Sequence, residues 1–215
     1  MKWKYNNISD EDGDELGSNA MQALLAASVS SYSGGSSGGN CIRVVENTIY
    51  FYGDVLESNA LELNSTLHAV DKKLQVSCQF LEVKPVINLH INSYGGSLFA
   101  GLATVDTIRR LNAEVHSVID GAAASAATII STSCTKRSIG KYSKMLIHQL
   151  SAGAYGKYTE LEDDMENNKH LMDTIKAIYK EYTKVPMKKL NEILKQDLWF
   201  DSKTCLELGL VDEII

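Results

Sequence analysis

The stretch Val-Ile-Asn-Leu-His-Ile-Asn-Ser-Tyr-Gly-Gly-Ser at residues 86–97 decides the fold class. Its first half is a short apolar run after Pro85, which is typical of a buried strand. The paired glycines lead into residues 97–111, whose apolar positions recur at helical spacing. Residues 114–119 have the composition of a second buried strand. A strand, a helix and a strand in this order predict an α/β domain.

The alternation of strands and helices continues through residues 41–215. We expect a strand or hairpin at 42–52, turning at Glu46-Asn47. Further strands are expected at 145–147 and 210–214, and further helices at 58–74, 122–132, 159–183, 187–195 and 203–208. Ser202 is placed to cap the last of these helices.

Residues 1–40 differ from the rest of the chain. Five acidic residues lie between positions 10 and 15, and a glycine- and serine-rich run fills 31–40. Such a composition buries too little apolar surface to offset the entropy of folding, so we expect a flexible extension with at most a short helix at 18–29. The apolar run 20–29 follows acidic residues, which argues against a signal peptide. The extension is interpreted as a propeptide, a docking arm or a tail without function.

Composition excludes several classes of function. The 215-residue chain carries a net charge of −6, which argues against nucleic acid as the main partner. Its four cysteines form no C-x-x-C pair, so we expect no zinc site, and no two histidines have metal-ligand spacing. No run of 18 apolar residues predicts a membrane span. We expect a cytoplasmic protein that needs no metal and no cofactor.

Three local features are candidates for chemistry. Ser125 follows the small residues 121–124 and opens an expected helix, a place that suits a nucleophile but equally suits close helix packing. The pair Gly95-Gly96 follows a strand and offers an oxyanion hole or a simple turn. His148 ends a short apolar strand, where it is either a general base or a packed histidine.

Taken together, four segments give the chain a family resemblance over residues 42–215. They are Ile-Asn-Ser-Tyr-Gly-Gly (91–96), Gly-Ala-Ala-Ala-Ser-Ala (121–126), Met-Leu-Ile-His-Gln (145–149) and Gly-Leu-Val-Asp-Glu-Ile (209–214). In this order and spacing the chain resembles ClpP, the proteolytic subunit of the Clp protease family. The resemblance implies an α/β fold of the ClpP/crotonase type, a spiral of β-β-α units with a protruding handle.

The resemblance also implies a serine endopeptidase. Ser125 would be the nucleophile, His148 the general base and Asp197 the group that orients the histidine. The backbone N–H groups of Gly96 and Ala126 would bind the oxyanion. Asp201 offers a second carboxylate, but Asp197 holds the family's place before the terminal motif.

Architecture and partners follow from the same resemblance. Family members stack two rings, usually of seven subunits, around a chamber, and residues 149–183 would be the handle that interlocks the rings. Unfolded protein, fed by an AAA+ unfoldase such as ClpX or ClpA, would add as a strand beside residues 96–99. The chain departs from the family at Tyr94 and Leu150, where proline is usual, and its leader does not match the family's axial loop.

Other functions stay open at this point. A phage head-maturation protease of the ClpP type shares the chemistry. A crotonase-like acyl-CoA enzyme shares the fold and uses acidic residues near the oxyanion hole, but Ser125 together with a matched histidine speaks against it. A non-catalytic ring subunit is the third alternative, and the presence of all three triad members speaks against it.

Overall fold

The computed structural model describes residues 41–78 and 84–215. The extension 1–40, with its expected short helix, lies outside the described residues. Eight strands form one mixed sheet, and this confirms the predicted α/β class. The strands are β1 (Ile42–Val45), β2 (Thr48–Tyr52), β3 (Val86–Ser93), β4 (Glu114–Ala124), β5 (Lys136–Ile139), β6 (Lys144–Leu146), β7 (Phe200–Asp201) and β8 (Glu213–Ile214).

The strand order is β1-β2-β3-β4-β5-β8, and the expected hairpin is the antiparallel pair β1–β2. From β2 to β8 all neighbouring strands along this path are parallel to each other. The long strand β4 divides its pairing, because its first half pairs with β5 and its last three residues pair with β6. Strand β7 closes the sheet antiparallel to β6.

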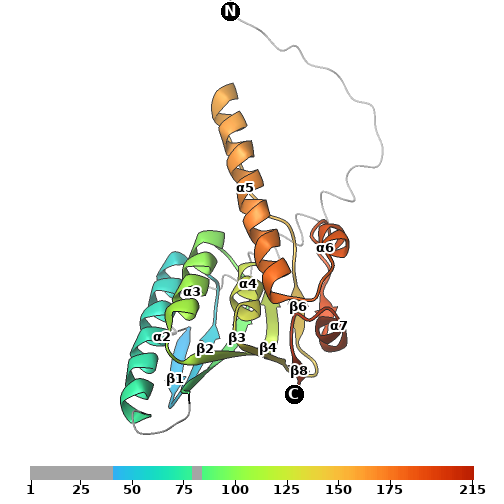
Figure 1. Cartoon of the computed structure of the whole chain (residues 1–215). Helices are drawn as coiled ribbons and strands as arrows, with labels where there is room; N and C mark the ends of the chain where they lie inside the picture. Colours follow the sequence, from blue (N-terminus) through green and yellow to red (C-terminus); the bar gives the residue numbers. More distant parts are fainter. Residues whose placement is uncertain (1–40, 79–83) are drawn as a thin grey trace, which may run out of the picture. The chain divides into compact units, whose positions relative to one another are not determined.

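Six helices are seen in the described residues: α2 (Glu57–Ser77), α3 (Leu98–Arg110), α4 (Ala126–Thr132), α5 (Tyr158–Tyr182), α6 (Met187–Ile193) and α7 (Ser202–Glu207). Helices α2 and α3 lie side by side against one face of the sheet, and α5 projects beyond the other helices (Figure 1). Residues 151–167 are all exposed, so only the C-terminal part of α5 contributes to the core.

The core forms where this helix layer meets the sheet. Alternate residues of β3 are buried, and its Ile87, Leu89 and Ile91 are completely shielded from solvent. Leu63 and Leu67 of α2, four residues apart and so on one face of the helix, are shielded to the same extent. The alternating apolar residues of β3 and the apolar face of α2 are therefore buried in the same core.

Four expectations about local structure need correction. Residues 122–124 continue β4 instead of starting a helix, because they pair with β6. Strands β5 and β7 were not expected from the sequence. The last strand is limited to Glu213–Ile214, since Leu210 and Val211 are buried without pairing in the sheet. Helix α7 is capped by Asp201 and not by Ser202, because the Asp201 carboxylate accepts a hydrogen bond from the Thr204 N–H.

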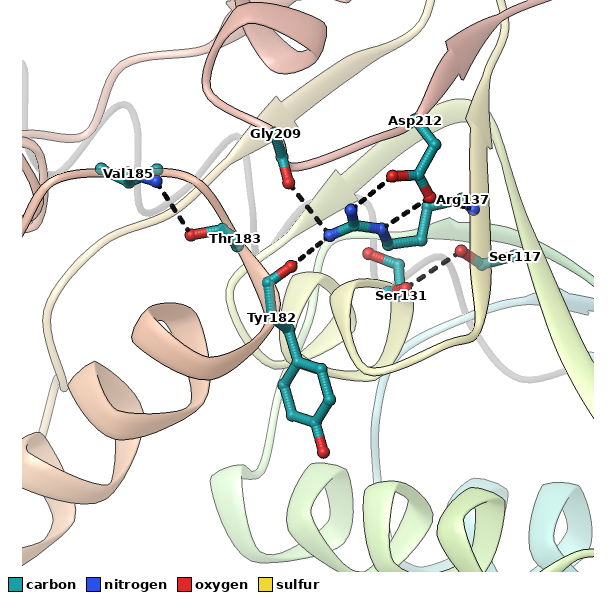
Figure 2. Close-up of polar contacts among 8 residues, drawn as sticks. All are labelled: Ser117, Ser131, Arg137, Tyr182, Thr183, Val185, Gly209 and Asp212. Carbon is teal, nitrogen blue, oxygen red and sulfur yellow. Dashed lines mark hydrogen bonds and ion pairs between the residues drawn. The ribbon is translucent and has the colours of Figure 1, made fainter.

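A buried arginine joins three distant segments (Figure 2). Arg137 of β5 donates through Nη2 and Nε to both carboxylate oxygens of Asp212, at 2.6 and 3.0 Å. Its Nη1 donates to the carbonyl of Gly209 at 3.0 Å and to the carbonyl of Tyr182, the last residue of α5. The guanidinium therefore fastens the end of α5 and the C-terminal segment to the sheet. These hydrogen bonds also lower the pKa of Asp212.

Replacing Arg137 by methionine should destabilise the fold by about 2 kcal/mol, because two carbonyls and a carboxylate lose their charged donor. Chemical denaturation monitored by circular dichroism measures this loss. Arg109→Met is the matched control: Arg109 pairs with Glu181 on the surface, so its loss should cost less than about 1 kcal/mol. Equal losses for the two variants would contradict the assignment of Arg137 as the anchor.

The same comparison has a pH dependence. Because the pKa of Asp212 is lowered in the folded state, its contribution is present above the ordinary carboxyl pKa and is lost as the pH falls through the lowered value. The stability gap between wild type and Arg137→Met should therefore narrow as the pH drops below about 4.

Candidate active site

Ser125 lies between the end of β4 and the start of α4 in a strained backbone conformation, with φ 52° and ψ −126°. For a residue with a Cβ atom, such a conformation costs on the order of 1–3 kcal/mol and persists only where the surroundings impose it. The N–H of Ser125 donates to the carbonyl of Leu146 in β6 at 2.9 Å. The strand pairing that extends β4 therefore places this serine in a sharp turn from strand to helix.

The turn after β3 packs directly against Ser125. Gly95 has φ 95°, and a Cβ added there would lie 2.7 Å from the Ser125 Cβ and 2.6 Å from the Ala124 carbonyl oxygen. Gly96 has φ 145°, and a Cβ there would lie 2.5 Å from the Val55 carbonyl oxygen. Both positions therefore require glycine for conformation and for space.

Two backbone donors beside Ser125 are free. Within the described residues, neither the Gly96 N–H nor the Ala126 N–H donates a hydrogen bond to another protein group. The Ala126 N–H belongs to the first turn of α4, whose amides have no partner within the helix. Both residues line one cavity together with Ser125. This arrangement is that of a site able to bind an oxygen anion.

His148 follows β6 and faces an acidic residue from the C-terminal part of the chain. Its Nδ1 lies 3.2 Å from Oδ1 of Asp197, in the connection between α6 and β7. The backbone next to His148 is held in place, because the Gln149 N–H donates to the Leu194 carbonyl at 2.7 Å. The Asp197 side chain is 80% exposed against 24% for His148, so the pair lies at the rim of the site.

A cavity of about 210 Å³ contains the predicted nucleophile and base. Ser125 and His148 both line it, although no hydrogen bond joins them directly among the described residues. Its walls are mostly apolar, from Leu98, Ala126, Ile129, Leu150, Ile175 and Tyr179. The sequence analysis missed Ile175 and Tyr179: the helical period of α5 signals that they are buried, but not which cavity they face.

The structure separates the two carboxylates that the sequence left as alternatives. Asp201 accepts the Thr204 N–H at 2.9 Å as the cap of α7, and these hydrogen bonds lower the pKa of its carboxyl. Asp197 makes the contact to His148 instead. Asp201 is thus occupied by a structural contact, and Asp197 lies beside the imidazole.

The two unusual residues of the site both have partners. The Tyr94 ring stands edge-on to the ring of Trp199 with centroids 6.1 Å apart, which connects the glycine turn to the segment of Asp197. The Leu150 N–H, a donor that a proline at this position would lack, donates to the Met172 Sδ at 3.0 Å. Both residues that the sequence analysis marked as departures from the family pattern therefore contact other parts of the fold.

Comparison with known proteins shows the family to which the chain belongs. Residues 46–215 match the family described as Clp protease. The chain belongs to the Clp protease family. It is 32% identical over 175 residues to an ATP-dependent Clp protease proteolytic subunit from Deinococcus radiodurans, a match that covers 80% of this chain and 82% of that protein. The chain is therefore a protease of the ClpP family, and the α/β arrangement described above is its ClpP-type fold.

The described residues were also expected to lack a metal site and a membrane span. Among residues 41–78 and 84–215, no group of three or more His, Cys, Asp or Glu side chains is arranged to hold a metal ion. No helix in these ranges is long and apolar enough to cross a membrane.

Gly95→Ala should destabilise this Clp protease family member, because the new methyl group would push the glycine turn away from Ser125. We expect a loss of about 2 kcal/mol, or a fall of roughly 5 °C in the midpoint of thermal unfolding. Gly153→Ala is the matched control, since a Cβ at Gly153 meets nothing within 4 Å. Equal midpoints for Gly95→Ala and wild type would show that the two segments do not pack as described.

Proposed function

We propose that the chain is a serine endopeptidase in which Ser125 is the nucleophile, His148 the general base and Asp197 the residue that orients the histidine. The observation that carries the proposal is that Ser125 and His148 line one cavity while the Nδ1 of His148 faces Asp197 at 3.2 Å. The third residue thereby contacts the ring nitrogen that is not needed for proton transfer. Membership of the Clp protease family supports the same assignment.

In the proposed reaction, Ser125 Oγ attacks the carbonyl carbon of a peptide bond and His148 Nε2 takes the hydroxyl proton. The imidazolium returns this proton to the leaving amine as the C–N bond breaks, which leaves an acyl-enzyme. Water, activated by His148, then releases the new carboxyl end and restores Ser125. Asp197 stabilises the imidazolium through Nδ1–H, and the free N–H groups of Gly96 and Ala126 face the negative oxygen.

The proposed reaction requires a hydrogen bond between Ser125 and His148, which is not formed directly among the described residues. Catalytic hydrogen bonds are often long in unliganded structures and tighten only in the complex. His148 belongs to a segment held by the Gln149–Leu194 bond and bordered by the exposed residues 151–157. We propose that this segment moves slightly when substrate binds and so completes the contact.

Unfolded polypeptide is the proposed substrate. Ser97 and Leu98, the cap and first residue of α3, lie at one side of the cavity, and the segment after His148 forms the other side. A chain entering between them is extended, and adds as a strand to the neighbouring backbone. The apolar walls of the cavity favour an apolar side chain next to the scissile bond.

We propose a ring assembly in which residues 149–183 form an interlocking handle. The projecting part of α5 exposes apolar side chains, among them Tyr158, Leu161 and Met165, and such residues are commonly covered in an assembly. The relative's description as the proteolytic subunit of an ATP-dependent protease supports a partner of the AAA+ unfoldase class, such as ClpX or ClpA. The four cysteines are all free, which supports a reducing, cytoplasmic location.

Ser125→Ala should abolish cleavage of a fluorescently labelled unfolded protein, with a loss of at least about 10³-fold, because the proposed reaction attacks the peptide carbonyl through Ser125 Oγ. The variant should also fail to react with a fluorophosphonate. Its native mass should equal that of the wild type, which controls for assembly. Full labelling or cleavage by Ser125→Ala would refute the proposal.

Asp197→Asn should lower kcat by roughly 10²–10³-fold, because the amide no longer stabilises the imidazolium. Asp201→Asn is the matched control, since it alters only a helix cap and should change kcat by less than about twofold. Steady-state kinetics with a chromogenic peptide distinguish the two. The reverse ranking of the variants would assign the triad to Asp201.

A further inference from the structure

A buried tyrosine from α5 reaches the turn that carries Ser125. Tyr179 is only 1% exposed, and its phenol oxygen lies 2.6 Å from Oγ1 of Thr128 in α4. Thr128 is completely buried, and its Oγ1 donates to the carbonyl oxygen of Ser125 at 2.6 Å. Two buried hydroxyls therefore connect α5 with the backbone of the candidate nucleophile.

The direction of the proton donations follows from the chemistry of the groups. A carbonyl oxygen only accepts, so Thr128 donates its single hydroxyl proton to the carbonyl oxygen of Ser125. Thr128 Oγ1 must then accept from Tyr179, which is the donor. Burial raises the pKa of Tyr179, so its proton is retained at the pH values at which proteins work. Hydroxyls in such a chain polarise one another and strengthen both bonds.

The acceptor at the end of this series of hydrogen bonds is the carbonyl oxygen of Ser125, the residue with the strained backbone. The Ser125 carbonyl also accepts the Thr128 N–H at 2.9 Å, while the Ser125 N–H donates to Leu146 at 2.9 Å. The peptide groups on both sides of the serine are thus held, one by β6 and one by Thr128. Together they impose the unfavourable φ and ψ of Ser125, and these angles set the direction of its side chain.

We propose that Tyr179 is a positioning residue, which holds Ser125 in its reactive backbone conformation through Thr128. This inference rests on the proposed function of Ser125 and extends it to a residue 54 positions away, on the helix that forms the proposed handle. Tyr179 also lines the cavity that contains Ser125, so its ring and its hydroxyl have separate roles. The ring shapes the apolar wall, and the hydroxyl fixes the nucleophile.

The test separates the hydroxyl from the ring. Tyr179→Phe keeps the wall of the cavity and removes one donor, so kcat should fall by about 3- to 10-fold while KM stays within about twofold. The second-order rate of labelling by a fluorophosphonate should fall by the same factor. Tyr182→Phe, three residues further along α5, removes a surface hydroxyl bonded to Arg109 and should leave both rates unchanged.

Variants of Thr128, the middle residue of the hydrogen-bonded series from Tyr179 to Ser125, add an independent check. Thr128→Val removes the link and should lower the labelling rate at least as much as Tyr179→Phe, whereas Thr128→Ser keeps the hydroxyl and should restore most of it. In the double variant Tyr179→Phe/Thr128→Val, the losses should not multiply, because both substitutions break one connected path. A thermal unfolding curve for each variant checks that it is still folded at the assay temperature, so that the labelling rates of folded proteins are compared.

Each outcome has one meaning. If Tyr179→Phe is labelled at the wild-type rate, or if the two losses multiply, Tyr179 does not position Ser125 and the inference is wrong. If Ser125→Ala remains active in the same assay, the proposed function itself fails. Inactivity of Ser125→Ala together with a normal Tyr179→Phe refutes only the inference.

Discussion

The close packing of Gly95 on Ser125 is the constraint on which the site depends. A Cβ at Gly95 would come within 2.7 Å of the Ser125 Cβ, so the two turns meet only because one of them lacks a side chain. The turns follow β3 and β4, which are neighbouring parallel strands. Loops at the carboxyl ends of parallel strands meet at one edge of the sheet, and this is where α/β proteins commonly build their sites. The proposed oxyanion donors and the candidate nucleophile thereby lie on neighbouring strands of one sheet.

The candidate site combines rigid and loosely held parts. Ser125 is held by the sheet, by α4 and by the hydroxyl chain from Tyr179. His148 lies just past a three-residue strand, and Asp197 lies in an exposed connection. The candidate nucleophile is thus fixed by the fold of the single chain, while His148 and Asp197 depend more on the surface segments around them.

The C-terminal turn of α5 is fixed at two points. Arg137 holds the carbonyl of Tyr182, and Tyr179 reaches Thr128 one turn earlier. The N-terminal part of the same helix is exposed and projects from the body (Figure 1). A displacement of the projecting part would be carried by the helix toward the turn that contacts α4. The helix therefore provides a direct structural connection between the proposed handle and the candidate nucleophile.

The amino-acid sequence by itself determined the α/β fold class and most helices and marked Gly96, Ser125 and His148 as candidates, because these features depend on local periodicity and on motifs of a few residues. Tertiary structure decided the rest. Residues 122–124 have a helical composition but form a strand, since β6 offers them hydrogen bonds, and β5 accommodates Arg137 because Asp212 pairs with it. The contact of His148 with Asp197 joins residues about 50 positions apart in the sequence. The hydrogen bonds that lead from Tyr179 through Thr128 to Ser125 span a similar separation. Such contacts form only when packing brings distant segments together, so no local pattern contains them.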